Sequence, residues 1–406
     1  MKVIVVTDYA MVNGGAGKVA LESAHALADV VEQVTIFVAI GEAAAFLLDK
    51  PNLKVITLGQ KKVTEQSYLT SIVGGLWNRE AERKFANLLD EHDPKDTIIH
   101  IHSWRDGLTL SFMPEVLRRG FKFVFTVHDY GLACPLAGFY DHRAKAICHH
   151  KGLSSQCLKT RCTNGSFIKK NWFVARFYLQ VKRAQMPAKL KHIIVIGPTT
   201  RRIMEPYLEP ETVVHYVPNF TDVEKGPRVK AEKNKDYAFV GRYSPEKDPV
   251  SAAQAAYLAK VPIRFIGTGP LVDEIRIANP DADLRGWRTP SEVKRLLGEV
   301  RAIIFPSVWY EGQPLVIDEA AALGLPVIVS ETSAATDSVE KFRHGLTFET
   351  GNVDALVRRI QEFEFDDVVE SYSKAGYQSY WENPSMMSSH IKALMTVYDV
   401  VLSDAS

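Results

Sequence analysis

Two carboxylates, Glu311 and Glu319, lie eight residues apart in the string FPSVWYEGQPLVIDEA, which spans residues 305–320. The string follows an apolar run typical of a buried strand, and we expect a tight turn at Gly312 and a helix from about Pro314. Free N–H groups at the start of a helix attract anions. A loop carboxylate, these amides and a second carboxylate two turns into the helix could bind a sugar, a diphosphate and a ribose.

Two cations follow another expected strand. Residues 239–248 read FVGRYSPEKD, so Arg242 and Lys247 come directly after Gly241. A guanidinium and an ammonium at this position can neutralise a diphosphate leaving group without a metal ion. Ordinary surface charge at a strand end is the alternative, but the position at the head of the second half of the chain favours a functional role.

Glycines mark two further loops. Gly267 and Gly269 lie in IGTGP (266–270), and Gly14 and Gly15 lie in NGGAGK (13–18) after the first expected strand. The second string lacks the first glycine and the Ser/Thr of a P-loop, and it also misses the Rossmann G-x-G-x-x-G pattern. A nicotinamide dehydrogenase is therefore disfavoured. What remains is a backbone that can approach a ligand's phosphates closely.

Three histidines lie on or just after neighbouring strand candidates. His100 and His102 alternate along one strand and so share a face. We expect these two to be buried, hydrogen-bonded structural residues, because no third metal ligand is near them in the sequence. His128 ends the next strand, where functional residues concentrate, and is expected to act in the site.

All four cysteines of the chain fall within one short window. Their spacing does not match the paired C-x2-C pattern of most structural zinc sites. Reduced thiols are the first interpretation and structural zinc the second; disulfides are disfavoured because the N-terminus does not read as a signal peptide. The residues are Cys134, Cys148, Cys157 and Cys162.

The elements that must position these residues alternate between β-rich and helical segments, which predicts an α/β fold with parallel sheets. The composition, with 46% hydrophobic and 24% charged residues over 406 positions, is that of a globular protein with about two domains. Expected strands are 2–7, 34–39, 54–58, 97–102, 121–127, 192–196 and 213–217, followed by 237–240, 262–266, 301–305 and 326–330.

A polar, charged stretch from 221 to 236 reads as a linker between two doubly wound domains. We expect one domain over 1–220 and another over 221–384. Open α/β sheets bind ligands at the carboxyl ends of their strands, so the expectation is a site in a cleft that the two domains face.

Positive charge is concentrated in one region, although the net charge is only +1. Residues 142–204 contain fourteen Lys and Arg and no acidic residue. Within them, 167–183 interleaves aromatic and basic residues, which favours an anionic membrane surface over a solvated helix face. Nucleic acid is disfavoured because no recognised binding fold accompanies the charge. No apolar run is long enough to span a bilayer, so a cytoplasmic, peripherally bound protein is expected.

Together, the E-x7-E string, the Gly241-Arg242…Lys247 loop, the Gly14-Gly15 loop and the linker at Val217-Pro218-Asn219 resemble retaining glycosyltransferases of family 4, which have the GT-B fold. The resemblance covers nearly the whole chain. It implies two Rossmann-like domains, the N-terminal one binding the acceptor and the C-terminal one the nucleotide-sugar donor. It also implies that a last helix, about 385–406, returns to the first domain.

The resemblance assigns roles to individual residues. Glu319 matches the carboxylate that holds the nucleotide ribose, and Glu311 matches the one that contacts the donor sugar. Arg242 and Lys247 match the diphosphate-binding pair, and His128 matches a histidine near the transferred sugar. The donor-binding segments would also include Gly14, Gly15, Gly241, Gly267, Gly269, Gly312, Gln313, Pro314 and Leu315.

The implied reaction is hexosyl transfer from a nucleotide-diphosphate sugar to a hydroxyl acceptor, with retention, without a metal or other cofactor, in polysaccharide or glycolipid synthesis. A lipid-linked acceptor is one possibility. The family usually has an acidic residue after its Gly-Gly-Ala, where this chain has Gly17. Two alternatives stay open: a sugar-nucleotide epimerase of the same fold, and a non-catalytic sugar-nucleotide-binding module.

Overall fold

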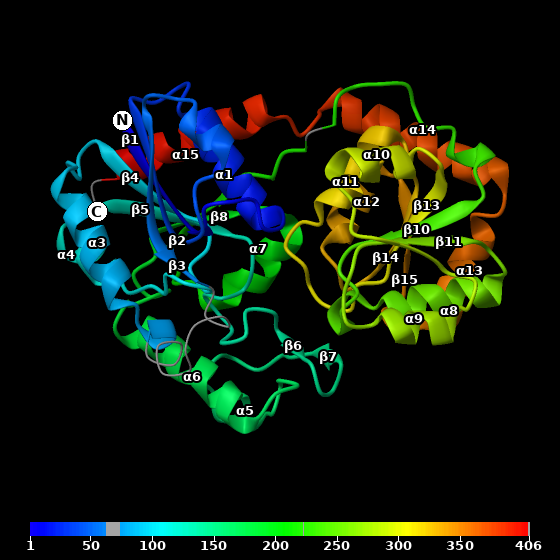
Figure 1. Cartoon of the computed structure of the whole chain (residues 1–406), viewed down its shortest axis with the longest axis horizontal. Coiled ribbons are helices and arrows are strands. Elements are labelled where there is room, and N and C mark those ends of the chain that lie inside the picture. Colours follow the sequence, from blue (N-terminus) through cyan, green and yellow to red (C-terminus); the bar gives the residue numbers. More distant parts are fainter. Residues whose placement is uncertain (62–73, 222, 405–406) are drawn as a thin grey trace. The chain divides into compact units, whose positions relative to one another are not determined.

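The computed structural model describes residues 1–61, 74–221 and 223–404 (Figure 1). The chain divides into two compact units. The first comprises Met1–Gly138, His149–Phe220 and Met387–Ser406, and the second comprises Phe139–Cys148 and Thr221–Met386. Residues 139–148 therefore group with the second unit, where the Phe139 ring lies 6.4 Å from the Tyr310 ring, whereas we expected them in the first domain.

The first unit contains a seven-stranded sheet in the order β3-β2-β1-β4-β5-β8-β9, and every neighbouring pair is parallel. A parallel sheet is covered by helices on both faces, which explains why its central strands β1 and β4 are buried along nearly their whole length. The strands are β1 (Lys2–Tyr9), β2 (Gln33–Ile40), β3 (Leu53–Gln60), β4 (Thr97–Ile101), β5 (Lys122–Val127), β8 (His192–Val195) and β9 (Val213–Tyr216).

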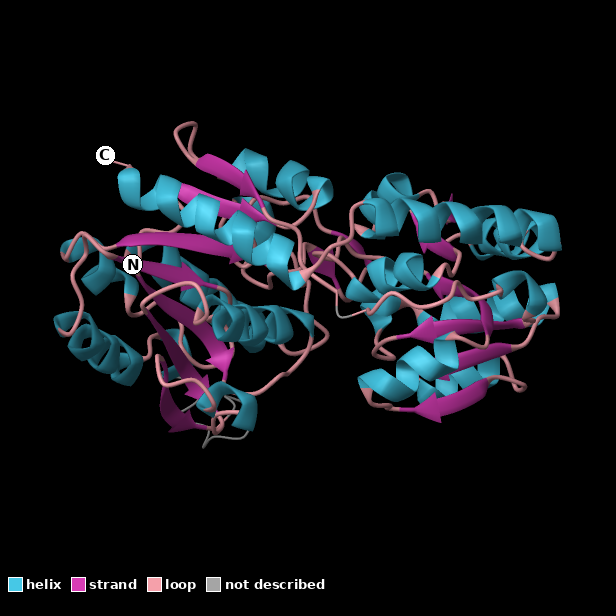
Figure 2. Cartoon of the chain, turned by 90° about the horizontal axis from the view of Figure 1, so that it is seen from above, coloured by secondary structure: helices cyan, strands magenta, loops and turns pink. Residues whose placement is uncertain are grey.

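Helices flank the strands of this unit (Figure 2). The C-terminal helix α15 contributes Leu394, Val397 and Tyr398 to the same apolar cluster as β1 and α1, so the end of the chain belongs to the first unit's core. The helices are α1 (Gly15–Leu27), α3 (Arg79–Asp90), α4 (Met113–Arg118), α5 (Ser155–Lys159), α6 (Phe167–Lys182), α7 (Pro198–Met204) and α15 (Met387–Ser403), with short 3-10 turns at Ala45–Leu48 and Glu205–Tyr207.

The second unit contains a six-stranded parallel sheet in the order β12-β11-β10-β13-β14-β15. Its strands are β10 (Asp236–Val240), β11 (Ile263–Ile266), β12 (Asp283–Gly286), β13 (Val300–Phe305), β14 (Val327–Ser330) and β15 (Gly345–Phe348), and a two-residue hairpin pairs β6 (Tyr140–Asp141) with β7 (Ala146–Ile147). Its helices are α8 (Pro249–Ala259), α9 (Val272–Ala278), α10 (Pro290–Leu297), α11 (Leu315–Leu323), α12 (Ala335–Phe342), α13 (Val353–Glu362) and α14 (Asp366–Glu382), with 3-10 turns at Ala231–Lys233 and Pro245–Lys247.

Both sheets are doubly wound. In each, the chain runs outward in one direction from a first strand and then crosses to its other side, between β1 and β4 in the first unit and between β10 and β13 in the second. Ligands of such sheets bind beyond the carboxyl ends of the strands at this crossing. The loops after β1, β10 and β13 carry the candidate residues, so the topology brings each set to the expected edge.

Candidate functional site

A buried ion pair forms the centre of the candidate site in the second unit. Lys247 Nζ lies 2.6 Å from Glu311 Oε1, and the Ser307 hydroxyl donates to the same oxygen at 2.6 Å. The side chains of Lys247 and Glu311 are only 20% and 8% exposed. The ammonium also lies 5.4 Å from the centre of the Phe305 ring. The two predicted residues are therefore in direct contact.

A second pair, Arg242 and Glu246, lies in the loop after β10. Arg242 Nη2 lies 2.8 Å from Glu246 Oε1, which also accepts a hydrogen bond of 2.7 Å from the Ser244 hydroxyl. Burial by itself raises the pKa of Glu246, but these hydrogen bonds and the Arg242 charge outweigh it and leave the pKa below its usual value. Glu246 thus stays ionised and anchors one end of Arg242, whose side chain is 65% exposed.

Glu246 also joins the two site loops through its backbone. Its carbonyl oxygen accepts from the Val308 N–H at 2.9 Å and lies 3.1 Å from the Ser307 hydroxyl oxygen, whose single proton goes to Glu311 at the shorter distance. The loop that carries Arg242 and Lys247 is thereby tied to the loop that carries Glu311. Sequence reasoning missed Glu246, because a glutamate in a polar loop gives no signal of burial.

The glycines after β10 and β11 serve the packing of these loops. Gly241 and Gly267 have φ of 153° and 146°, values that side chains disfavour. A Cβ on Gly267 would collide with the carbonyl oxygen of Gly241, and one on Gly269 with that of Tyr243. Gly267 and Gly269 therefore allow the backbone to pack closely against the loop that carries Arg242.

The turn before α11 differs from the expectation. The residue with a left-handed backbone is Glu311, with φ of 55°, and not Gly312. A left-handed conformation costs a residue with a side chain roughly 1–2 kcal/mol. The tight turn at Gly312 was predicted from glycine's freedom alone; here the strain instead falls on the carboxylate itself. Strain of this kind concentrates at functional sites.

Helix α11 starts at Leu315, and Pro314 precedes it at the cap position without any side-chain cap. Gln313 Nε2 donates to Asp318 Oδ2 at 2.6 Å, so the predicted Gln313 bridges the loop and the first turn. Asp318 is buried, which raises the pKa of its carboxyl group. Glu319, one residue further on, is partly exposed.

In the first unit, Gly14 caps α1 with φ of 95°, and Gly15 opens the helix. A Cβ on Gly14 would meet nothing within 4 Å, so its backbone conformation, and not crowding, favours glycine. No side chain caps the N-terminus of α1 and no acidic residue lies in its first turn. This end of the helix is therefore suited to an anion.

His128 follows β5 and lies against a second imidazole. Its Nε2 is 2.9 Å from His102 Nδ1, and the two rings are stacked with centres 5.2 Å apart. Burial, and to a lesser extent the charge of His390, lowers the pKa of His128 to about 3. The ring is neutral at physiological pH, so it exchanges hydrogen bonds without carrying charge.

His100 and His102 behave differently from each other. His100 is hydrogen-bonded on both sides, to the Tyr398 hydroxyl at 2.7 Å and to the Thr126 hydroxyl at 2.7 Å, as a structural histidine would be. His102 contacts His128 directly, which sequence reasoning did not anticipate. Burial lowers the pKa of both rings well below the usual value. The H-x-H pattern beside a strand end was the available signal.

No disulfide joins the four cysteines Cys134, Cys148, Cys157 and Cys162. Among the residues that the structure describes, no group of three or more His, Cys, Asp or Glu side chains is placed to hold a metal ion. Reduced thiols and structural zinc both stay predictions.

The basic region 142–204 includes helix α6, which exposes apolar side chains. Ile168 is 73% and Tyr178 52% exposed. Lys170, in contrast, is buried and donates to the carbonyl oxygens of Cys157 and Thr160. Within the described ranges, none of the helices has the length and apolar character needed to cross a bilayer.

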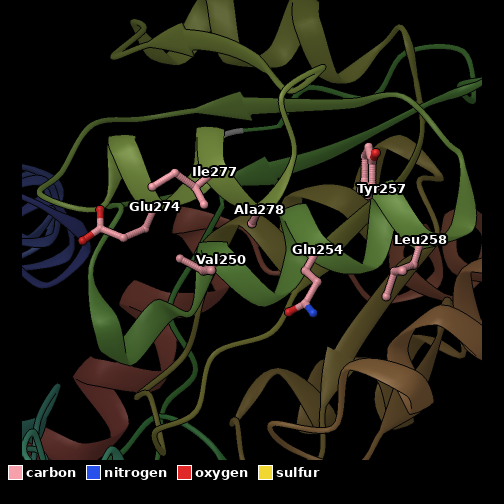
Figure 3. A pocket seen from close by; sticks show the side chains of 7 residues that line it. All are labelled: Val250, Gln254, Tyr257, Leu258, Glu274, Ile277 and Ala278. Atoms are coloured by element: carbon pink, nitrogen blue, oxygen red, sulfur yellow. The ribbon is translucent and has the colours of Figure 1, made fainter.

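A separate hollow of about 490 Å³ lies between α8 and α9 in the second unit (Figure 3). Its lining includes Tyr257, Leu258 and Ile277, and none of the candidate site residues. The predicted donor residues therefore do not depend on this hollow.

Comparison with known proteins identifies the family. The profile described as Glycosyltransferase Family 4 matches residues 13–225, and the profile of Glycosyl transferases group 1 matches residues 221–380. One relative is the UDP-Gal:alpha-D-GlcNAc-diphosphoundecaprenol alpha-1,3-galactosyltransferase of Escherichia coli, 28% identical over 42% of this chain and 50% of its own length. Another is the amylovoran biosynthesis glycosyltransferase AmsK of Erwinia amylovora, 32% identical over 26% of this chain and 29% of its own. The chain thus spans half or less of the length of these relatives.

Solved structures show the same fold over the whole chain. HepE from Anabaena, in complex with UDP, matches with a TM-score of 0.66 at 14% identity over 98% of this chain and 100% of its own. Sucrose-phosphate synthase from Thermosynechococcus elongatus matches with a TM-score of 0.67 at 16% identity over 100% of both chains. The fold is GT-B, with two Rossmann-like domains, and the chain belongs to glycosyltransferase family 4.

Proposed function

We propose that the protein is a retaining, metal-independent glycosyltransferase of the hexosyltransferase class. It would transfer a sugar from a nucleotide-diphosphate sugar to a hydroxyl acceptor in the synthesis of a cell-surface polysaccharide or glycolipid. The observation that carries the proposal is the preassembled pair of Lys247 and Glu311 beside Arg242 at the carboxyl edge of the second unit's sheet. The names of the E. coli and E. amylovora relatives support this class of reaction.

When the donor binds to the second unit, its diphosphate would replace Glu311 as the partner of Lys247. In the structure the Lys247 ammonium is neutralised by Glu311. A diphosphate takes over the ammonium, and the released carboxylate then accepts hydrogen bonds from the hydroxyls of the donor sugar. Glu319, on α11, would hold the nucleotide ribose. HepE, which shares the fold, has been solved with UDP, and this supports a nucleotide diphosphate as the ligand class.

The chemistry would rest on stabilising the departing diphosphate. Arg242, Lys247 and the uncapped N-terminus of α11 supply positive charge where negative charge builds up. The leaving phosphate takes the acceptor proton on the same face of the sugar, so the anomeric configuration is retained without a protein nucleophile. The neutral His128 would orient the transferred sugar by hydrogen bonding. Two cations perform the role that a divalent metal has in other diphosphate sites.

A panel of nucleotide diphosphates and their sugars tests the donor assignment. The true donor should raise the melting temperature most, because a ligand that binds only the folded state stabilises it by mass action. Incubation of that donor without acceptor then separates the alternatives: an epimerase converts the sugar nucleotide alone, and a transferase does not. Stabilisation by no member of the panel would refute the proposal, and a product with inverted anomeric configuration would refute retention.

We further propose that residues 142–204 bind an anionic membrane surface, which would place a cytoplasmic enzyme beside a lipid-linked acceptor. The exposed Ile168 and Tyr178 among the basic residues of α6 support it. Flotation with anionic liposomes at low salt measures it. Ile168→Ser should weaken flotation, whereas Ile277→Ser, at a position 81% exposed in the second unit, should not. Absence of binding by the wild type would overturn this proposal alone.

A further inference from the structure

An arginine pair lies at the carboxyl edge of the first unit's sheet, outside the residues assigned above. Arg105 follows β4, in the loop after His102. Arg176 comes from the middle of α6. No role was predicted for Arg105, and Arg176 was named only as one of the basic residues of 142–204.

Gln180 fixes where Arg176 lies. It donates through Nε2 to the Gly131 carbonyl at 3.0 Å and accepts from the Trp104 indole N–H at 3.3 Å. Residues four apart on a helix share a face, so Arg176 lies on the face that Gln180 turns toward the loops after β4 and β5. Gly131 in turn leaves room for Arg105: a Cβ there would lie 2.9 Å from Arg105 Cδ. The two guanidinium groups therefore share one neighbourhood.

Arg176 is partly buried and lacks a matching anion. Within the described part of the chain, no hydrogen bond or ion pair joins its guanidinium to another residue, and its Cζ lies 5.6 Å from the centre of the Trp172 ring. Burial, followed by the like charge of Arg105, lowers the pKa of Arg176 to about 10. A guanidinium has five N–H donors, and the partly exposed Arg176 uses none of them on the described protein atoms.

The acids nearby are largely committed to other partners. The Asp8 carboxylate accepts three backbone N–H groups, at 2.9, 2.9 and 3.1 Å, and burial raises its pKa to about 6. Asp106 accepts from the Tyr9 hydroxyl at 2.9 Å. Asp129 accepts from the Gly131 N–H at 2.8 Å and lies 3.7 Å from Arg105 Nη1, too far for a hydrogen bond.

We propose that Arg105 and Arg176 form a subsite for a phosphate or diphosphate group of the acceptor substrate. Arginine pairs bind phosphate oxygens through two parallel N–H donors, which supplies both affinity and orientation. The proposal rests on the proposed function and deepens it, because it assigns the acceptor a chemical class: a hydroxyl compound that carries phosphate close to the sugar. The phosphate could belong to a soluble metabolite or to a lipid headgroup.

Calorimetric titration of pyrophosphate into protein saturated with the best-binding nucleoside diphosphate tests this subsite apart from the donor site. The saturated protein should still bind pyrophosphate. Arg176→Gln and Arg105→Gln should each weaken that binding by about tenfold or more, the loss expected for hydrogen bonds to a charged group. Lys182→Gln removes one charge from the exposed end of the same helix and should change it by less than about twofold.

Asp129→Asn is expected to strengthen pyrophosphate binding, which a misfolded variant would not do. The amide oxygen can still accept from the Gly131 N–H, but the charge that competes for Arg105 is removed, so pyrophosphate should bind more tightly. A parallel titration with farnesyl diphosphate distinguishes the sources: tighter binding than pyrophosphate indicates a lipid-linked acceptor, and equal binding a soluble one. No binding of either probe to the nucleotide-loaded wild type, unchanged binding in both arginine variants, or weaker binding in Asp129→Asn would overturn the subsite. Failure of the nucleoside diphosphate itself to bind would instead refute the proposed function.

Discussion

Replacing Glu311 by glutamine should separate nucleotide binding from sugar transfer. The amide keeps the size of the side chain and an oxygen that accepts from Ser307, but it removes the charge 2.6 Å from the Lys247 ammonium. At an effective dielectric constant of about 20, two unit charges at this distance attract by roughly 6 kcal/mol before desolvation is subtracted. In the wild type a diphosphate must compete with that attraction for Lys247.

Glu311→Gln is expected to strengthen nucleoside diphosphate binding and to lower turnover. Glu311→Gln should bind the nucleoside diphosphate about tenfold more tightly, which corresponds to about 1.4 kcal/mol and is a small share of the attraction removed. Turnover should fall by about two decades or more, because the carboxylate proposed to hold the donor sugar is lost. Lys247→Ala should lower turnover by a similar factor and weaken nucleoside diphosphate binding, by about tenfold or more, because it removes a charged donor.

Isothermal titration of the nucleoside diphosphate, with turnover of the corresponding sugar nucleotide measured in parallel, checks both variants. Melting temperatures serve as the folding control, since removing one partner of a buried pair also destabilises the protein. Weaker nucleotide binding in Glu311→Gln, or unchanged binding in Lys247→Ala, would refute the exchange of partners. Near-normal turnover in both would refute the site assignment altogether.

Three further outcomes are expected. Gly267→Ala should lower the melting temperature of the second unit, by an amount equivalent to about 2 kcal/mol or more, because its Cβ collides with the Gly241 carbonyl at a disfavoured φ; an unchanged melting temperature contradicts the packing role. His102→Ala should lower kcat and His102→Asn, whose amide can replace Nδ1, should restore much of it; equal loss in both argues against a positioning role for the hydrogen bond to His128. Because the pKa of His128 is lower in the folded than in the unfolded state, the unfolded state binds more protons below about pH 6.5, and stability falls as the pH drops toward 3. The free energy of unfolding, measured by urea denaturation, should therefore fall less between pH 6.5 and 5 in His128→Gln than in the wild type, the difference approaching about 1.4 kcal/mol per pH unit. An identical pH dependence would contradict the buried neutral imidazole.

The central strands of both sheets could be predicted because each is a short apolar run. The run at 2–7 became β1 and the run at 301–305 became β13, buried along their lengths as parallel strands require. Strands β12 and β15 escaped prediction. Their sequences, DLRG and GLTF, are only four residues long, lie at the sheet edges and remain partly exposed, so they carry no continuous apolar signal.

Some features of the candidate site could likewise be predicted from the sequence, and others could not. Lys247 and Glu311 could be singled out from residue type and from their place after strands, because parallel strands bring their carboxyl ends to one edge. The role of Glu246 could not, since it depends on a backbone contact to a loop more than sixty residues later. The same holds for the stacking of His102 on His128. The left-handed backbone at Glu311 runs against local propensity, which favoured Gly312, and tertiary contacts to Ser307 and Lys247 hold it in place.

A crystal structure of the protein with its nucleotide-sugar donor tests the central claim most directly. The account predicts diphosphate oxygens within hydrogen-bond distance of Lys247 Nζ and the Arg242 guanidinium, with the Glu311 carboxylate turned to the sugar hydroxyls. A donor bound elsewhere, with the Lys247–Glu311 pair still closed at its present 2.6 Å, would contradict it.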